Sequence, residues 1–201
     1  KVAPLIVMMS CLNFSLLKWI IVASLFTGGI GGLMQTSIRK LMAFSSINHL
    51  GWLLSTYLLA PIYWNIYFLF YSLLTLTIVS LCSLMQVYYL NQLYSNLISN
   101  FMLKFTFMTS LLSLGGLPPF TGFLPKWIII QALALDSLPI LLSMVMSTLI
   151  TLFFYLRLSY SAFMVSYTSP SWNLSLQFNS NFKLSIILMI SLCGLPSIMV
   201  L

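Results

Sequence analysis

Residues 104–135 read KFTFMTSLLSLGGLPPFTGFLPKWIIIQALAL, an apolar stretch with two glycines and two prolines at its centre. As a single helix the stretch would be about 48 Å long, well beyond a hydrocarbon core of about 30 Å. Glycine weakens a helix and proline removes a backbone donor, so the segment 115–119 predicts a break. The first half, 104–114, rises about 16 Å, which places the break near the middle of a membrane.

The composition of the whole chain agrees with a membrane setting. Of its 201 residues, 61% are hydrophobic and only 4% are charged, with eight cations, one acid and a formal net charge of +7. Soluble domains carry about 25% charged residues, so water cannot be the main solvent of this surface. The cations are too few and too scattered for a phosphate-binding stripe, which argues against nucleic acid as a partner.

The remaining apolar runs predict an all-α bundle of transmembrane helices. Spans are expected at 16–34, 41–60, 66–90, 138–163 and 183–201, each about as long as a bilayer requires. Residues 1–12 are too short to span and are typical of the end of a helix that began upstream, and the chain starts without a methionine. We expect a loop at 35–40, a short turn at 61–65 and a polar loop at 166–181. The glycine pairs at 28–32 predict close helix packing.

The loop charges predict an orientation. The second, fourth and sixth connections carry or adjoin five cations: Arg39, Lys40, Lys104, Arg157 and Lys183. The first, third and fifth carry only Lys18 and Asp136. The positive-inside rule therefore places the first group on the cytoplasmic or matrix side, with the C-terminus opposite.

Lys126 is the first candidate for chemistry, because it lies in the second half of the broken span. A charged lysine at a helix centre costs about 3 kcal/mol on membrane-insertion scales. Burial disfavours the charged form of an amine, which can then take up and release protons. A broken helix supplies freed backbone groups and room for water. The alternative is a lysine whose ammonium reaches the membrane interface near Asp136.

His49 and Lys1 are the other candidates. His49 is the only histidine, and it shares the span 41–60 with Ser45, Ser46 and Asn48. Histidine titrates near neutral pH and suits a proton relay, although a neutral histidine bonded across helices is an equal alternative. Lys1 becomes a second intramembrane lysine if the chain continues upstream. No Walker loop, GxGxxG motif or cluster of cysteine, histidine and acidic residues is present, so no bound redox cofactor or metal is expected.

Two stretches resemble a known family. They are GGLMQTSIRKLMAFSSINHLGW at 31–52 and LSLGGLPPFTGFLPKW at 112–127. Both are similar to the hallmark sequences of the subunit 2 family of mitochondrial NADH–ubiquinone oxidoreductase, respiratory complex I. Both stretches are long, and their separation of about 80 residues is the same as in the family. The resemblance extends more loosely to the C-terminus, and it covers the family's C-terminal part.

This resemblance implies an antiporter-like fold of two inverted five-helix repeats, each with a broken helix. Residues 1–201 would form a single transmembrane domain: 1–12 the end of an upstream span, 16–163 the second repeat, and 183–201 an extra C-terminal helix. Lys126 would match the lysine of the second broken helix, Lys1 the connecting lysine of the proton path, and His49 the histidine of that path. The glutamate and lysine of the first repeat are not in this chain.

The resemblance also implies a function. The chain would be a core membrane-arm subunit of a proton-translocating NADH:ubiquinone reductase in the mitochondrial inner membrane. It would bind no cofactor itself, with NADH, FMN, iron–sulfur clusters and ubiquinone in partner subunits. Expected partners are other membrane-arm subunits and lipids such as cardiolipin. The alternatives are a structural spacer without its own proton channel and a stand-alone ion/proton antiporter of the same ancestry.

Overall fold

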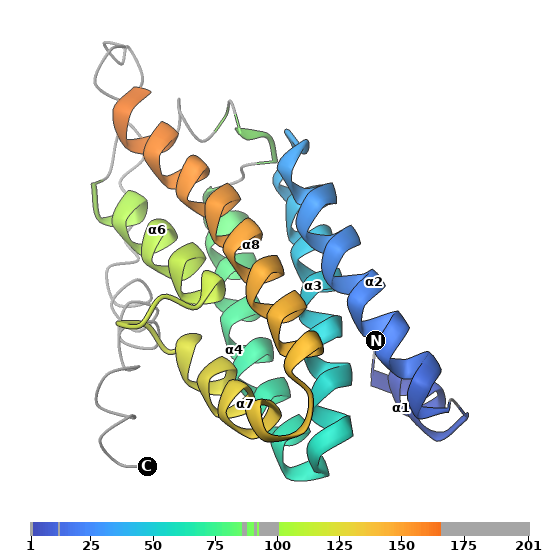
Figure 1. The fold of residues 1–201 in the computed structure, drawn as a ribbon. Coiled ribbons are helices and arrows are strands. Elements are labelled where there is room, and N and C mark those ends of the chain that lie inside the picture. Colours follow the sequence, from blue (N-terminus) through green and yellow to red (C-terminus); the bar gives the residue numbers. More distant parts are fainter. Residues whose placement is uncertain (1, 12, 86–87, 91, 93–100, 166–201) are drawn as a thin grey trace.

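The computed structural model describes residues 2–11, 13–85, 88–90, 92 and 101–165. These residues form a bundle of helices: α1 (Val2–Cys11), α2 (Phe14–Leu33), α3 (Ile38–Leu59), α4 (Pro61–Met85), α6 (Phe101–Gly115), α7 (Phe123–Asp136) and α8 (Leu138–Val165). Figure 1 shows the long helices running side by side. Lys1, the predicted loop at 166–181 and the predicted span at 183–201 lie outside the described residues.

Three of the described helices, α2, α4 and α8, are long and apolar enough to cross a membrane. Helix α3 has 22 residues, so its length of about 33 Å is also sufficient. It is less apolar because it carries two cations in its first turn and four polar residues near its middle: Ser45, Ser46, Asn48 and His49. The predicted spans at 16–34, 41–60 and 138–163 are therefore confirmed as helices, with small shifts at their ends.

The predicted turn at 61–65 is wrong, because α4 already begins at Pro61. Only Ala60 interrupts the helices, with an extended backbone, and its amide still donates to the Thr56 carbonyl at 3.1 Å. Proline suits the first helical position, where its missing N–H would have no helical acceptor and its φ is already close to helical. Helix α4 thus begins five residues before the start of the span predicted at 66–90.

The predicted break in the stretch 104–135 is confirmed. Helix α6 ends at Gly115 and α7 begins at Phe123, so the two half-helices follow one another along the side of the bundle (Figure 1). Gly116 has φ +83°, a left-handed conformation that glycine adopts without strain. The half-helices pack on the long helices α4 and α8, which extend past the break on both sides.

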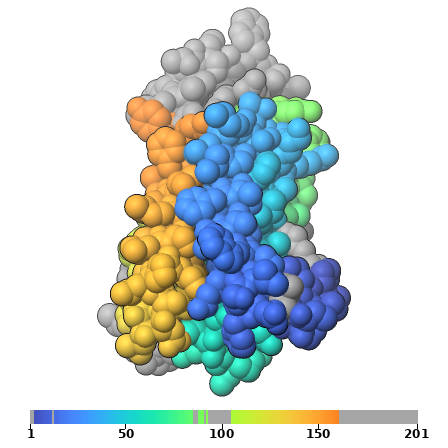
Figure 2. Space-filling model, turned by 45° about the vertical axis from the view of Figure 1, so that its right-hand side comes forward, coloured from blue at the N-terminus to red at the C-terminus, as the bar shows by residue number. Residues whose placement is uncertain are grey.

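Close packing of α2 positions the long helices. Helix α2 packs against α3 and α8, and Figure 2 shows α2 (blue) and α8 (orange) side by side on one face. A Cβ at Gly28 would lie 2.5 Å from the Asn48 backbone nitrogen, and one at Gly32 would lie 2.8 Å from the Phe154 ring. The prediction that the small residues at 28–32 allow close approach is confirmed.

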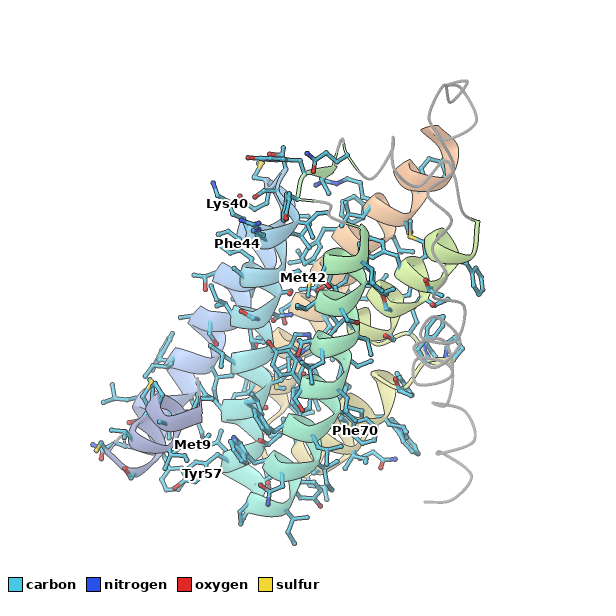
Figure 3. The ribbon with its side chains drawn as sticks, turned by 180° about the vertical axis from the view of Figure 1, so that it is seen from behind. Met9, Lys40, Met42, Phe44, Tyr57 and Phe70 are labelled. Atoms are coloured by element: carbon cyan, nitrogen blue, oxygen red, sulfur yellow. The ribbon has the colours of Figure 1, made fainter. Side chains whose placement is uncertain are left out.

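Three described cations of the even-numbered connections, Arg39, Lys40 and Arg157, lie at one end of the bundle. Arg157 donates from Nη2 to the Leu33 carbonyl at 2.9 Å, and the Arg39 guanidinium lies 4.2 Å from the centre of the Tyr88 ring. Figure 3 shows Lys40 near this end and Tyr57 near the other. We call the end that carries Arg39, Lys40 and Arg157 the basic end.

We predict that Gly28→Ala destabilises the bundle by about 1–3 kcal/mol, because the added methyl group overlaps the backbone of α3 rather than a side chain that could move. The amount of assembled protein on native gels and its thermal stability would report this loss. Gly29→Ala is the matched control, since its Cβ would meet Ile150 at an ordinary 3.5 Å. Equal behaviour of the two variants would contradict the packing described here.

Candidate functional site

The site is built at the C-terminus of α6. The last four carbonyls of a helix have no partner within the helix. Here the Leu117 amide donates to Leu112 at 3.4 Å and the Gly116 amide donates to Ser113 at 3.1 Å. This is the pairing of a Schellman motif, with Gly116 as its left-handed residue. Two carbonyls, those of Leu114 and Gly115, remain for other donors.

Lys126 supplies those donors. Its Nζ donates to the Gly115 carbonyl at 2.9 Å and to the Leu114 carbonyl at 3.2 Å. Lys126 lies in the first turn of α7, and side chains in a helix lean toward its N-terminus, here toward the end of α6. The residue is only 6% exposed. The alternative that its ammonium reaches the interface near Asp136 is therefore wrong.

Two glycines make room for this arrangement. A Cβ at Gly116 would lie 2.9 Å from Lys126 Cδ and 3.0 Å from its Nζ. A Cβ at Gly122 would overlap the Ser113 carbonyl oxygen. Any other residue type at 116 would place its side chain against Lys126, and any other residue type at 122 would place its side chain against the end of α6.

The charge of Lys126 is balanced by dipoles rather than by an acid. The C-terminus of a helix carries a partial negative charge of about half an electron, and the amine sits directly on it. The Trp52 ring is 5.9 Å from Nζ, at the outer limit of a cation–π contact. Asp136, the only acid of the chain, lies about 15 Å away along α7.

His49 lies on the neighbouring helix α3 and is also 6% exposed. Its Nδ1 shares a 2.7 Å hydrogen bond with the Tyr67 hydroxyl, and the histidine tautomer decides which of the two donates. The Tyr71 ring lies 4.8 Å from the imidazole ring, centre to centre. Tyr67 in turn stacks on Trp52, with the rings parallel within 4°.

A small cavity joins these residues. It is lined by His49, Tyr67, Tyr71 and Lys126, together with Phe70, Leu74, Leu114, Gly122 and Pro125. Its volume of about 10 Å³ is close to the lower limit for one water molecule. The structure therefore brings together two of the three residues predicted from the sequence, Lys126 and His49. The third, Lys1, lies outside the described residues.

Tyr67 and Tyr71 are site residues that the sequence analysis missed, because it considered only lysine and histidine as candidates for proton chemistry. Their spacing of four residues places both hydroxyl-bearing rings on one face of α4. Three tyrosines at four-residue spacing, Tyr63, Tyr67 and Tyr71, are the signal in α4 that could have identified this face of the helix.

The site contains side chains that can take up and release protons. Lysine and histidine each exist in two protonation states, and a tyrosine hydroxyl donates and accepts at the same time. The cavity between them is close to the smallest volume that can hold one water molecule.

The chain matches two family profiles. Residues 1–151 match the transmembrane domain described as NADH:quinone oxidoreductase/Mrp antiporter, and residues 152–201 match the NADH dehydrogenase subunit 2 C-terminus.

Curated relatives carry the name NADH-ubiquinone oxidoreductase chain 2. The Anopheles gambiae protein is 49% identical over 90% of this chain and 53% of its own length, and the Aedes aegypti protein is 42% identical over 100% and 59%. The Anopheles albimanus protein is 52% identical over 67% of this chain and 80% of its own length. The chain spans a little over half the length of the first two relatives.

Solved structures share the fold. A chain of respiratory complex I from Thermus thermophilus aligns with a TM-score of 0.70 at 22% identity, covering 92% of this chain and 44% of that one. A chain of the Mrp complex from Dietzia aligns with a TM-score of 0.64 at 21% identity, covering 73% and 29%. With matching profiles over its whole length, the chain belongs to the NADH:quinone oxidoreductase/Mrp antiporter transmembrane family, in the NADH-ubiquinone oxidoreductase chain 2 branch.

Proposed function

We propose that this chain forms part of a membrane-arm subunit of the proton-pumping NADH:ubiquinone oxidoreductase of the mitochondrial inner membrane. In this proposal Lys126 and His49 move protons, in response to electron transfer in other subunits. The names of its relatives support the assignment to this complex. The proton-carrying role of the two residues rests on the geometry of the site.

The observation that carries the proposal is the position of the Lys126 amine. It is buried at the end of a broken helix, has no acidic partner within the described residues, and lines one cavity with His49. An ammonium that is paired with a carboxylate is held in its charged form. An ammonium held only by carbonyls can give up its proton at a lower cost.

The two carbonyl bonds suit both protonation states of Lys126. An ammonium has three N–H donors, of which two serve Leu114 and Gly115. A neutral amine retains two N–H groups, which is enough for the same two bonds, and gains a lone pair. That lone pair can accept a proton from a water in the cavity, and His49 with Tyr67 can return one.

The wider assignments extend the same proposal. Residues 16–163 would be the second five-helix repeat, 183–201 an extra helix, and 1–12 the end of an upstream span in which Lys1 continues the relay. NADH, FMN, iron–sulfur clusters and ubiquinone would be bound by partner subunits, and this chain would bind none of them. Its neighbours would be other membrane-arm subunits, and cardiolipin headgroups at the basic end.

One observation favours a second candidate, the structural spacer. The Lys126 amine completes the hydrogen bonding of the α6 C-terminus, a purely structural task. A spacer needs that bond but has no need of proton exchange, so the two candidates predict different defects for the same variant.

We predict that Lys126→Met, measured in the complete complex in sealed vesicles, lowers the number of protons moved per NADH oxidised. Methionine keeps an unbranched side chain of similar length but can neither bond the two carbonyls nor carry a proton. Lys18→Met is the matched control, because Lys18 is exposed near the start of α2.

The two candidates separate on two readouts. A lower proton ratio with near-normal assembly supports the relay. Poor assembly, with a normal ratio in the complexes that do form, identifies a spacer and rules out the relay.

We further predict that His49→Gln and His49→Leu both reduce the proton ratio. Glutamine can bond the Tyr67 hydroxyl but does not titrate, whereas leucine does neither. If glutamine restores full pumping and leucine does not, then His49 serves only as a hydrogen-bonding residue. The measurement is again the proton-to-NADH ratio, with native gels to follow assembly.

A further inference from the structure

Trp52 on α3 is a buried tryptophan to which the proposed relay gives no task. Its side chain is 0% exposed, and its indole nitrogen Nε1 has no hydrogen-bond partner among the described residues. A buried tryptophan usually pairs its N–H group with an acceptor. Because this one does not do so within the described part of the chain, its contribution to the site lies in the faces of its ring.

The ring contacts both proton-carrying parts of the site. The Lys126 Nζ lies over it, 5.9 Å from the ring centre. The Tyr67 ring is parallel to it within 4°, with the ring centres 6.1 Å apart. The hydroxyl of the same tyrosine shares the 2.7 Å hydrogen bond with His49 Nδ1. Trp52 is therefore a direct neighbour of the lysine and, through Tyr67, of the histidine.

Close packing fixes the position of this ring. Gly51, the residue before Trp52, faces α2 so closely that a Cβ there would lie 2.7 Å from Leu25 Cγ. On its other side Trp52 belongs to the same buried apolar cluster as Ile129 and Leu133 of α7, the helix that carries Lys126. The tryptophan is thus held between α2 and α7 and cannot withdraw from the amine without disturbing both contacts.

The two protonation states of Lys126 differ in what they gain from the ring. The ammonium has three N–H groups, of which two serve the Leu114 and Gly115 carbonyls. Its third N–H and its positive charge are attracted by the negative face of an aromatic ring, most strongly by tryptophan. Loss of the proton leaves two N–H groups for the same two carbonyls but removes the charge that the ring attracts. The ring therefore favours the charged form of the amine.

The titratable groups around the amine offer no anion in its place. His49 of α3 and Tyr67 and Tyr71 of α4 line the cavity, and Tyr155 of α8 packs on Gly115. A tyrosine is ordinarily neutral at physiological pH, and a histidine is neutral or positive. No carboxylate from the described helices faces the amine, so the ring supplements the dipole of the α6 C-terminus.

We propose that Trp52 is a positioning residue of the proton site, whose ring face stabilises the protonated amine of Lys126 at the end of α6. The inference rests on the proposed function and deepens it, because it names the side chain that helps the amine to keep its proton until the relay takes it. The stack on Tyr67 orients the ring for this task.

Infrared spectra of the complete complex with nitrogen-15-labelled lysine test this role. The Lys126 ammonium band is the one that vanishes in Lys126→Met. At a pH where the band has half of its full intensity in the unchanged complex, we expect it to be about two- to three-fold weaker in Trp52→Leu, the loss that a weak cation–π attraction implies. Trp52→Met, with a more adaptable side chain, should show the same loss if the leucine variant fails to assemble.

Two further variants separate the ring face from packing. Trp52→Phe keeps a ring face and loses only an N–H group without a partner in the described part of the chain, so it should retain most of the band. Trp127→Met is the matched control, because Trp127 follows Lys126 in the sequence but is 37% exposed. Its band should keep the intensity of the unchanged complex.

An undiminished band in the leucine and methionine variants of Trp52 overturns the inference. An equal loss in Trp52→Phe overturns it as well, since packing alone would then explain the effect. Failure of the proposed function looks different. If the band weakens in Trp52→Leu while Lys126→Met pumps normally, the ring acts on the amine as inferred, but the amine carries none of the pumped protons.

Discussion

The bond between the Lys126 amine and the end of α6 is the constraint on which the rest of the site depends. A helix that stops inside a membrane leaves carbonyls away from bulk water, and each needs a donor. Gly116 and Leu117 satisfy two of them through the backbone, and Lys126 satisfies the other two. The broken helix and the buried lysine therefore stabilise each other, which explains why the sequence carries both.

This mutual dependence also gives the site its chemistry. Because carbonyls and not a carboxylate hold the amine, the lysine can exist with or without its proton while keeping both bonds. The amine faces a cavity that His49 and two tyrosines share, so a proton that leaves it has acceptors nearby. In the proposed function the structural cap and the proton carrier are thus one arrangement, in a chain that belongs to the NADH:quinone oxidoreductase/Mrp antiporter transmembrane family.

The break, Lys126 and His49 were predictable because each is a local anomaly in an apolar chain: glycines and prolines in a span, a charge in hydrocarbon, a single histidine. The carbonyls to which Lys126 donates were not predictable, because they depend on how the loop at 116–122 folds back onto α6. The hydrogen bond between Tyr67 and His49 was not predictable either, because it forms only when α3 and α4 pack. The prediction of a turn at Pro61 was wrong because proline is also common at the first position of a helix.

The central claim is that the Lys126 amine changes its protonation state during turnover. Infrared difference spectra of the complete complex, oxidised against reduced, with nitrogen-15-labelled lysine, test it most directly. We predict a lysine N–H band that shifts on reduction, that persists in Lys18→Met and that vanishes in Lys126→Met. A shifting lysine band that survives in Lys126→Met, or no shifting lysine band in the unchanged complex, would contradict the claim.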